Sequence, residues 1–596
     1  MRCLALNIEC VDDQGGFRFS AVALECVEVL GTPRSPIIRA PSAAQNGVLR
    51  RYASGPGAKG DVNMSEPFRN EPLLDFSTAS RADAMRKSIE HVRSRLGASY
   101  PLVIGGHHVV SAATATFSSI NPARPDEVIG VHITATPEHV SQAIDGAAAA
   151  FPEWSRTPVQ QRIDCLLKTA DVIQRRRAEF TAMLILEVGK PWTEADGEVA
   201  EAMDLLRWYA HQMDRLASSQ HLTPIAGEDA EYFYVALGVG AIISPWNFPL
   251  AITTGMTSAA LVAGNCVVVK PASNSATTVA WLVDALHEGG VPGPVLSYVT
   301  GSGSAIGDAL VEDRQVRFIA FTGSREVGIR IHERAAVVGP GQIWLKRALL
   351  EMGGKNAVVV DETADLDAAA LGIVQSAFGY QGQKCSAGSR AVVVESIQVS
   401  LLEKVVALAL ELNVGDPADR ETSIGPVIDA NAYAKINDYI RKGALEAHLA
   451  YSGDIPQSDG YFIRPTIFSA VPPGSTIAQE EIFGPVLAVI PAQDLADALS
   501  IANGTPFGLT GALYSRNPDA VADARSRFHV GNLYINREST GALMGVHPFG
   551  GFNMSGTDSK AGGPDYLLFF MQGKSVGERL IDGQRVGASL AHARTH

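Results

Sequence analysis

Apolar and polar positions follow helical spacing through the first third of this chain. The stretch RADAMRKSIEHVRSRLG, at about 80–97, has the pattern of an amphipathic helix that ends at a glycine. Two short strands are predicted around 102–116. Helical spacing follows at about 136–151, 158–188 and 192–218.

The middle of the chain alternates between strand and helix patterns. AIISPW, CVVVK, VLSYVTG and RFIAFTG have the short apolar runs of buried strands, and helical segments separate them. A second alternating set runs from about 356 to 535. Alternation of this kind predicts parallel sheets with crossover helices, which is a doubly wound α/β fold.

Both ends of the chain differ from this pattern. Residues 1–63 hold three of the six cysteines and become rich in Pro, Gly, Ser and Ala, whereas Met64 opens a more orderly segment. We expect 1–63 to be a disordered extension or a misassigned translation start. A targeting segment is the alternative, but its acidic residues weigh against a transit peptide. The polar stretch 576–596 is expected to be a frayed tail.

Composition and charge narrow the function. The net charge of −14 gives no electrostatic reason to bind nucleic acid or an anionic membrane. No apolar run is long enough for a membrane span. The six cysteines form no CxxC pair, so neither a disulfide framework nor a metal site is predicted. A reducing cytoplasm is the simplest location.

Cys385 is the first candidate for chemistry. It lies in GYQGQKCSAGSR, a glycine-rich segment whose backbone N–H groups could hold an oxyanion. Lys384 or a helix N-terminus nearby would help by lowering the pKa of the thiol. The alternative is a small buried apolar residue, which is the common fate of a free cysteine.

Two further residues could act with this cysteine. Glu351 stands between apolar residues and a Gly-Gly pair, where partial burial would raise its pKa toward that of a general base. Asn247, in SPWNFP, could donate a hydrogen bond to an oxyanion. Taken alone, a glutamate such as Glu351 is more often a capping or paired carboxylate, and SPWNFP could be a rigid aromatic turn.

Other segments could bind a nucleotide. Lys270 ends a buried strand, where it could reach a ribose or phosphate or simply be a solvated lysine. The turns GSGSAIG (301–307) and FTGSREVG (321–328) are both glycine-rich and both precede a helix. The pattern does not decide which of them holds a pyrophosphate.

Together these segments closely resemble the aldehyde dehydrogenase superfamily. SPWNFP, VVVKPAS, FTGSREVG, LEMGGK, GQKCSAG, EEIFGPV, NGTPFGLTGALYS and HPFGGFNMSG occur in the family's order between about 65 and 581. The family's spacing of 34 residues from glutamate to cysteine is also kept.

The resemblance implies a role for each matched residue. Cys385 attacks an aldehyde, Asn247 and the Cys385 N–H hold the oxyanion, and Glu351 activates the water that hydrolyses the thioester. Lys270 and Glu481 contact the two riboses of NAD, Ser324 lies by the pyrophosphate, and Phe483 packs nearby. The cofactor set is completed by Ser244, Trp246, Ser273, Gly303, Gly307, Phe321, Gly323 and Gly328. Many members carry glutamate where Ser273 stands, so NADP use remains open.

A narrower resemblance is to L-glutamate γ-semialdehyde dehydrogenases, also called 1-pyrroline-5-carboxylate dehydrogenases, which act in proline catabolism to glutamate. It rests on EPFRNEP, GQIWLKRALLEMGGK and the stretch 536–566. It implies that Gly541, Ala542 and Ser386 hold the substrate's α-carboxylate while Phe248 and Phe549 enclose its aliphatic part. Alternatives are another small acidic or aliphatic aldehyde and, remotely, a non-catalytic binding protein.

The family's organisation implies three parts. We expect a cofactor domain at 65–218 and 237–350, a catalytic domain at 351–555, and an oligomerisation flap at 219–236 and 556–575. EYFYVAL and YLLFFMQ are predicted as flap strands. A long apolar strand is a liability at an open edge, so we expect a homodimer or an assembly of dimers. The sequence shows no proline dehydrogenase domain, so we expect a stand-alone enzyme. Association with a separate proline dehydrogenase is left open.

Overall fold

The computed structural model describes residues 6–10, 17–21, 68–110, 115–218, 220–557 and 559–586. The chain divides into two units, Met1–Asn63 and Met64–His596. In the first unit, β1 (Leu6–Cys10) pairs antiparallel with β2 (Phe17–Ala21). The rest of the predicted extension lies outside the described residues, as does the tail from residue 587.

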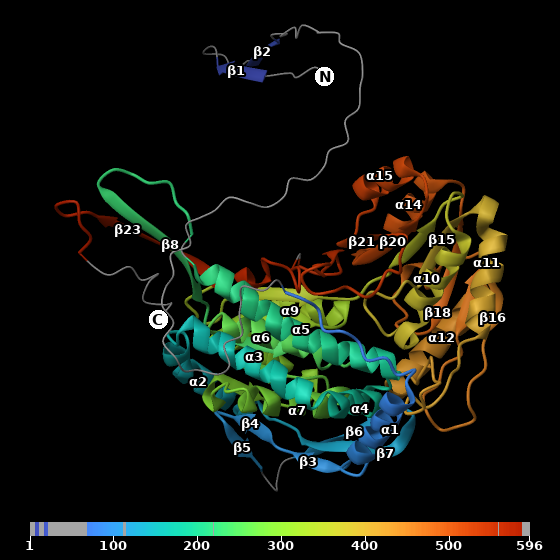
Figure 1. Ribbon diagram of the computed structural model, residues 1–596, viewed down its shortest axis with the longest axis horizontal. Helices are drawn as coiled ribbons and strands as arrows, with labels where there is room; N and C mark the ends of the chain where they lie inside the picture. The colour runs from blue at the N-terminus through green and yellow to red at the C-terminus, as the bar shows by residue number, and fades with distance from the viewer. Residues whose placement is uncertain are drawn as a thin grey trace, which may run out of the picture. The chain divides into compact units, whose positions relative to one another are not determined.

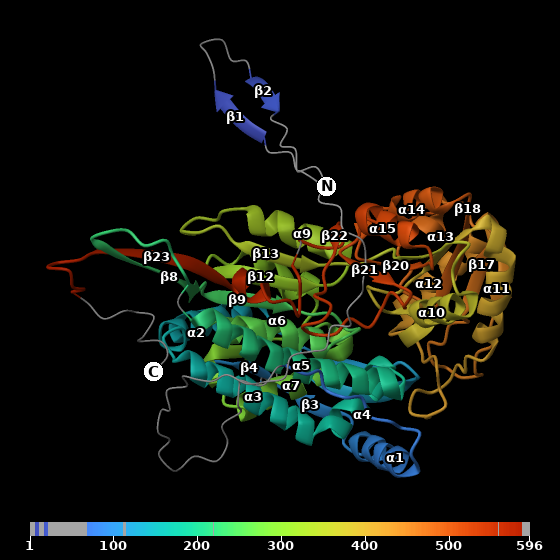
Figure 2. The ribbon, with the colours of Figure 1, turned by 45° about the horizontal axis from the view of Figure 1, so that its top comes forward.

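A seven-stranded sheet in the order β13-β12-β9-β10-β11-β4-β5 forms the first α/β layer of the larger unit (Figures 1 and 2). Its strands are β4 (Leu102–Ile104), β5 (His107–Val109), β9 (Val239–Ile243), β10 (Cys266–Lys270), β11 (Leu296–Tyr298), β12 (Val316–Thr322) and β13 (Arg347–Glu351). Strands β9 to β13 are parallel, and β4 and β5 are antiparallel additions. The strand order reverses between β9 and β12, and ligands bind at such switch points, beyond the carboxyl ends of the strands.

A second seven-stranded sheet follows the order β16-β17-β18-β15-β14-β20-β21 (Figure 2). Its strands are β14 (Ala357–Val360), β15 (Arg390–Val394), β16 (His448–Ser452), β17 (Thr466–Ser469), β18 (Val486–Ala492), β20 (Thr510–Tyr514) and β21 (Asn532–Ile535). All neighbours are parallel except the β16–β17 pair. The predicted doubly wound α/β fold is confirmed.

The helices of the first layer are α1 (Ala79–Arg93), α2 (Pro137–Trp154), α3 (Val159–Arg175), α4 (Arg177–Val188), α5 (Trp192–Ala217), α6 (Ala251–Val262), α7 (Ala276–Glu288), α8 (Asp308–Glu312) and α9 (Arg325–Ala336). The predicted helix at 158–188 is two helices, because Arg176 leaves the helical conformation at φ −104° and ψ 16°. The second sheet carries α10 (Leu366–Phe378), α11 (Glu395–Leu410), α12 (Ala430–Glu446), α13 (Thr476–Gln479), α14 (Leu495–Asn503) and α15 (Pro518–Arg527).

Smaller sheets complete the unit. Strands β3 (Ala98–Tyr100), β6 (Thr116–Asn121) and β7 (Arg124–Ile133) form a three-stranded sheet. The short strands β19 (Phe507–Gly508) and β22 (Phe552–Asn553) pair with each other. A two-stranded antiparallel ribbon joins β8 (Glu228–Ala236) to β23 (Met571–Arg579), and these strands lie side by side in Figures 1 and 2.

The prediction that YLLFFMQ is a flap strand is wrong over its first five residues. Tyr566–Phe570 is a 3-10 helix, and Tyr566, Leu567 and Phe570 are buried in the core of the first layer. Apolar side chains that are buried within their own chain present no open edge. The polar strand β23 pairs with β8 instead, so this segment no longer supports the predicted dimer.

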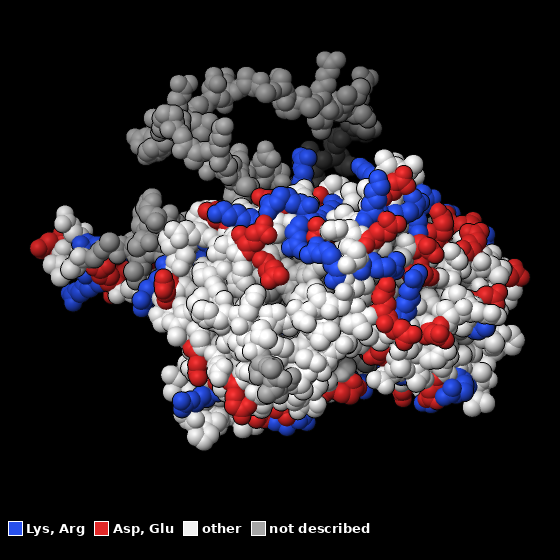
Figure 3. Space-filling model, turned by 90° about the horizontal axis from the view of Figure 1, so that it is seen from below, with Lys and Arg blue, Asp and Glu red and all other residues white. Residues whose placement is uncertain are grey.

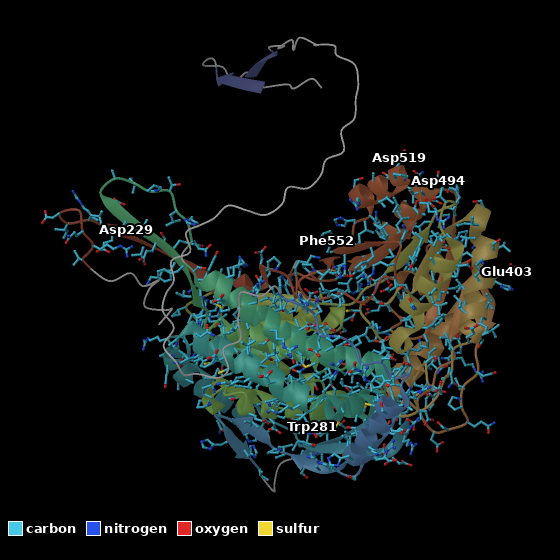
Figure 4. All side chains as sticks on the ribbon, viewed as in Figure 1. Asp229, Trp281, Glu403, Asp494, Asp519 and Phe552 are labelled. Carbon is cyan, nitrogen blue, oxygen red and sulfur yellow. The ribbon has the colours of Figure 1, made fainter. Side chains whose placement is uncertain are left out.

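The predicted frayed tail is also wrong where the structure describes it. β23 continues through Arg579, and Arg585 forms ion pairs with Asp229 and Glu231 of β8. Asp229 is labelled on the ribbon in Figure 4. These charges attach the segment after β23 to the same two-stranded ribbon.

Positive and negative side chains are mixed on the face shown in Figure 3, around an area without charged residues. That face therefore shows no extended field of one sign. In the described part of the chain, no helix has the length and apolar character that crossing a bilayer requires.

Candidate active site

The candidate catalytic residues lie where the two large sheets meet. Glu351 ends β13 at the carboxyl edge of the first sheet, whereas Cys385 precedes β15 at the amino edge of the second. Asn356, which precedes β14, donates from Nδ2 to the carbonyl oxygens of Cys385 (2.7 Å) and Ala387 (2.9 Å). These bonds fix the nucleophile loop to the second sheet.

The nucleophile loop begins with unusual backbone geometry. Tyr380 and Gln381 have φ values of 49° and 57°, which are costly for residues other than glycine. The Tyr380 hydroxyl donates to the carbonyl of Val188 (3.0 Å), and the Gln381 amide donates to that of Gly189 (2.9 Å). The turn between α4 and α5 therefore holds this loop in place.

The thiol of Cys385 is strongly shifted toward its protonated form. Burial raises its pKa to about 12, and the nearby carboxylates of Glu351 and Glu481 act in the same direction. We expected Lys384 to lower this pKa, but its Nζ lies 2.7 Å from Oε1 of Glu194. Because that charge is neutralised by Glu194, the Lys384 expectation is wrong for this structure.

Asn247 lies beside the nucleophile loop. It is buried in the turn between β9 and α6, and its Nδ2 donates to the backbone carbonyl of Gln383 (3.0 Å). A primary amide has two N–H groups, so the second can serve a developing oxyanion. The structure thus brings Asn247 to the loop of Cys385, as predicted.

Glu351 is oriented by the segment that contains Gly550 and Ser559. Its Oε1 accepts a short hydrogen bond from the Ser559 hydroxyl, and a Cβ on Gly550 would lie 3.1 Å from that oxygen. Glu481 is anchored differently, since the N–H of Gly354 donates to its Oε1 (2.9 Å). Gly354 also lies against the nucleophile loop, because a Cβ on it would lie 2.6 Å from the carbonyl oxygen of Cys385.

A cradle for a dinucleotide lies at the switch point of the first sheet. Ser324 caps α9 by accepting from the N–H of Val327 (3.3 Å), directly after β12. On the neighbouring strand, the buried hydroxyl of Ser244 has no hydrogen-bond partner among the described residues. An uncommitted polar group beside a helix N-terminus fits a bound pyrophosphate or ribose.

Other predicted cofactor residues line the same edge. Lys270, at the end of β10, is buried and donates to the carbonyl of Pro271 (3.0 Å). Burial lowers its pKa to about 8.

Trp246 packs edge-on against Phe483 with ring centroids 5.5 Å apart, and Phe483 has a φ of 61°. A strained aromatic residue at a site of this kind fits a close contact with a ligand ring.

The two glycine-rich turns differ in position. Gly303–Gly307 forms a π-helical turn after β11, at some distance in strand order from the switch point. Phe321, Gly323, Ser324 and Gly328 span the end of β12 and the start of α9, at the switch point itself. A Cβ on Gly328 would meet Met352 Sδ at 2.4 Å, so glycine permits α9 to approach the strands. The position favours the 321–328 turn for the pyrophosphate.

The predicted substrate loop lies against the residue that follows the nucleophile. The Ser539 hydroxyl donates to the carbonyl of Ser386 (3.2 Å), and Ser386 itself is buried. Gly541 has a φ of 73°, a conformation that favours glycine. Arg537 donates to the carbonyls of Thr540 (2.7 Å) and Gly541 (3.1 Å).

This loop leaves donors available. In the described part of the chain, neither Gly541 nor Ala542 donates its N–H to a protein acceptor. Phe549 is held nearby by paired backbone hydrogen bonds with Ala561 at 2.8 Å. Two adjacent backbone N–H groups beside a serine hydroxyl can hold a carboxylate.

Several site residues were not predicted. Lys190 is fully buried, with its Nζ 3.3 Å from the ring centroid of Phe248. Gln383 accepts from Asn247 and, through Oε1, from the N–H of Ile428 (3.0 Å). Glu201 also raises the pKa of Cys385. The only feature of the sequence that marks Lys190 is the Gly-Lys-Pro that interrupts a helical pattern. That feature does not indicate which residues Lys190 contacts.

Comparison with known proteins identifies the family. Residues 109–576 match the aldehyde dehydrogenase family. A 1-pyrroline-5-carboxylate dehydrogenase of Geobacillus kaustophilus (strain HTA426) is 52% identical over 86% of this chain and 100% of its own length. The protein of that name from Bacillus subtilis (strain 168) is 49% identical over the same shares.

Solved structures agree. A Thermus 1-pyrroline-5-carboxylate dehydrogenase with bound NAD aligns with a TM-score of 0.84 and 47% identity, over 86% of this chain and 99% of that one. Proline utilization A (PutA) of Bdellovibrio bacteriovorus aligns with a TM-score of 0.86 and 42% identity, over 88% of this chain and 54% of that one. The chain therefore belongs to the aldehyde dehydrogenase family.

Proposed function

We propose that this enzyme oxidises L-glutamate γ-semialdehyde, the open form of 1-pyrroline-5-carboxylate, to L-glutamate with NAD. The observation that carries the proposal is the uncommitted pair of N–H groups at Gly541 and Ala542. Their loop is tied by Ser539 to Ser386, the neighbour of the nucleophile. An aldehyde whose far end is a carboxylate fits this arrangement.

The relatives support the same substrate and cofactor. Proteins about half identical to this chain carry the name 1-pyrroline-5-carboxylate dehydrogenase, and the Thermus structure of that name contains NAD. The residues around the switch point fit such a cofactor, since Ser244 offers a free hydroxyl and α9 its N-terminus. When bound, NAD accepts the hydride that the oxidation releases.

The chain's own residues divide the reaction into two steps. Cys385 Sγ releases its proton to water and bonds to the aldehyde carbon, and the electron pair of the C=O double bond moves to the oxygen, which takes the negative charge. Asn247 Nδ2 and the Cys385 N–H stabilise that oxygen. Loss of hydride leaves a thioester on Cys385. Glu351 takes a proton from water, whose oxygen attacks the thioester carbon; the C–S bond then breaks to give the acid and free Cys385.

Substrate choice follows from the far end of the site. Ser386 and the N–H groups of Gly541 and Ala542 bind the α-carboxylate, and Phe248 and Phe549 enclose the aliphatic carbons. The aromatic walls are fixed, since Phe248 packs edge-on against Tyr380 with centroids 6.0 Å apart. A longer or branched chain would not place its aldehyde at Cys385.

The test is a substrate panel run with NAD and with NADP. We expect kcat/KM to be highest for L-glutamate γ-semialdehyde with NAD, above succinate semialdehyde, glutaraldehyde and betaine aldehyde. A preference for an aldehyde without the α-amino acid group would replace the proposal with a broader acidic or aliphatic aldehyde dehydrogenase. Failure of Cys385 to react with any alkylating agent would favour a binding protein.

We further propose a division of labour and an assembly. Residues 65–218 with 237–350 bind the cofactor, 351–555 carry the nucleophile, and the β8–β23 ribbon is the oligomerisation flap. The ribbon supports a homodimer or an assembly of dimers because it is an isolated two-stranded sheet, which gains stability by pairing or packing. Sedimentation that shows only monomer would contradict the assembly.

Two proposals concern the setting of the enzyme. Cys165, Cys266 and Cys385 are free thiols, which fits a reducing cytoplasm. Association with a separate proline dehydrogenase is supported by the match to a bifunctional proline utilization A (PutA) protein, of which this chain covers 48%. Co-sedimentation of the two purified enzymes tests it, and independent boundaries would count against it.

A further inference from the structure

A buried ion pair lies behind the two loops of the active site. The Nζ of Lys190 is 2.6 Å from Oε2 of Glu198, and neither side chain has exposed surface. Burial lowers the pKa of Lys190, while the carboxylate of Glu198 favours its charged form. Because burying two charges is costly, such a pair needs further contacts to be retained.

Those contacts are aromatic. The Lys190 ammonium lies 3.3 Å from the ring centroid of Phe248 and 4.3 Å from that of Tyr380. The two rings are nearly perpendicular, at 87°. A cation on an aromatic ring is attracted to it most strongly where water is excluded. One ammonium thus joins the residue after Asn247 to the start of the nucleophile loop.

The carboxylate continues the link toward Asn247. Glu198 Oε1 accepts from the N–H groups of Leu250 (2.8 Å) and Ala251 (3.1 Å), at the start of α6. Asn247 and Phe248 lie in the turn just before this helix. The Lys190–Glu198 pair therefore holds the Asn247 loop at two points. Lys190 contacts the Phe248 ring, and Glu198 accepts hydrogen bonds at the start of α6.

We propose that Lys190 is a positioning residue that holds the Phe248 ring, and with it the Asn247 amide, in register with Cys385. The inference rests on the proposed function, because it assigns Lys190 to the same reaction. Lys190 acts without touching the aldehyde, since Phe248 and Tyr380 lie over its ammonium. Its loss should slow the attack on the aldehyde while cofactor affinity is kept.

The primary experiment measures the pre-steady-state burst of reduced cofactor in Lys190→Met, which keeps the length of the side chain without its charge. We expect the burst rate constant to fall tenfold or more, with the dissociation constant for NAD within twofold of the unaltered enzyme. Arg177→Met is the matched control, because Arg177 pairs with Asp196 between α4 and α5 and contacts neither active-site loop. It should lower Tm without changing the burst.

A second variant separates positioning from charge balance. Lys190→Met leaves Glu198 buried without its cation, which can destabilise the fold by itself. Lys190→Met/Glu198→Gln removes both charges and keeps an oxygen to accept from Leu250 and Ala251. We expect this double variant to recover Tm while its burst stays slow. Recovery of the burst as well would overturn the proposal, because Lys190 would then serve only to neutralise Glu198.

A double-mutant cycle tests the route through the ring. In a Phe248→Leu background, Lys190→Met should change the burst rate constant by less than twofold. A loss as large as in the unaltered background would overturn the proposal, as would an unchanged burst in Lys190→Met alone. The burst is followed with the aldehyde of the panel that the unaltered enzyme oxidises fastest. A wrong substrate assignment is thereby distinguished from a wrong role for Lys190.

Discussion

Asn247 donates from its side-chain amide to the backbone carbonyl of Gln383, two residues before Cys385, at 3.0 Å. This bond crosses from the first sheet to the nucleophile loop of the second. The group proposed to stabilise the oxyanion is therefore attached directly to the loop that carries the nucleophile. The hydrogen bond therefore links the position of the Asn247 amide to that of the nucleophile loop.

Asn247→Ala should lower kcat about 10²–10³-fold, the range measured when one oxyanion donor is removed. Asn247→Asp, which has the same size but no N–H, should be equally impaired. Steady-state rates with saturating NAD measure both. If Asn247→Asp retains more than a tenth of the activity, the contribution of Asn247 to kcat comes from the shape of its side chain rather than from its hydrogen bond.

Glu351→Gln should separate the two chemical steps. An amide cannot take a proton from water, so the thioester should form and then persist. We expect a stoichiometric burst of reduced cofactor followed by slow turnover, measured by stopped-flow absorbance. Cys385→Ala is the control and should give no burst while still binding NAD. Fast turnover of Glu351→Gln would show that another group is the base.

Alkylation of Cys385 should depend steeply on pH. Burial and the carboxylates of Glu351, Glu481 and Glu201 raise the pKa of this thiol to about 12, so the reactive thiolate is scarce at neutral pH and increases as pH rises. Without cofactor, the iodoacetamide rate should rise about tenfold per pH unit between pH 7 and 9. Cys385→Ala gives the background from other thiols. A plateau below pH 9 would contradict the raised pKa.

The same measurement on Glu351→Gln gives an internal check. Removing one of the carboxylates that raise the pKa of Cys385 should speed alkylation at pH 8. An unchanged rate would show that Glu351 does not contribute to the raised pKa, which would then be due to burial and to the carboxylates of Glu481 and Glu201.

Ser273→Glu should increase the preference for NAD over NADP. Ser273 begins the short 3-10 helix Ser273–Ser275 after β10, beside the Lys270 end of the cradle. A carboxylate there would repel a 2′-phosphate, and we expect the ratio of kcat/KM values to shift about tenfold or more. Ser273→Gln matches the size without the charge and should leave the ratio within threefold. Equal shifts in both variants would indicate a steric effect.

Gly541→Ala should raise KM for L-glutamate γ-semialdehyde and leave that for a short aliphatic aldehyde nearly unchanged. At φ 73° a side chain is strained by about 1–2 kcal/mol, so the loop should shift its N–H groups. Gly97→Ala is the matched control, because Gly97 has φ 78° and open space around its Cα. A KM increase for both aldehydes would show that the effect of the loop is not specific to the carboxylate.

The fold could be read from the sequence because its strands are short apolar runs separated by amphipathic helices. The site could be located because its loops have a distinctive composition, such as the glycines around Cys385 and the prolines around Asn247. Lys190 could not be interpreted, because its partners Phe248 and Tyr380 lie far along the chain. The prediction that Lys384 lowers the pKa of Cys385 was wrong for the same reason, since its partner Glu194 lies far along the chain, in α5.

The apolar run at 566–570 shows another limit. A short run of large apolar residues is compatible with a strand or with a buried helical turn, and periodicity alone does not distinguish them. Burial against α5 and α6 decided the outcome. The break at Arg176 likewise has no proline or glycine to mark it.

The buried turn at 566–570 also constrains the order of folding. Tyr566 stacks on Tyr209 of α5 with centroids 5.4 Å apart, and Phe570 meets Phe318 of β12 edge-on at 5.3 Å. The core of the first layer, whose strands are synthesised early, is thus completed by side chains near the C-terminus. While the ribosome is still making the second sheet, the first exposes apolar surface on α5, α6 and β12. Chaperone binding should therefore persist until residue 570 has emerged.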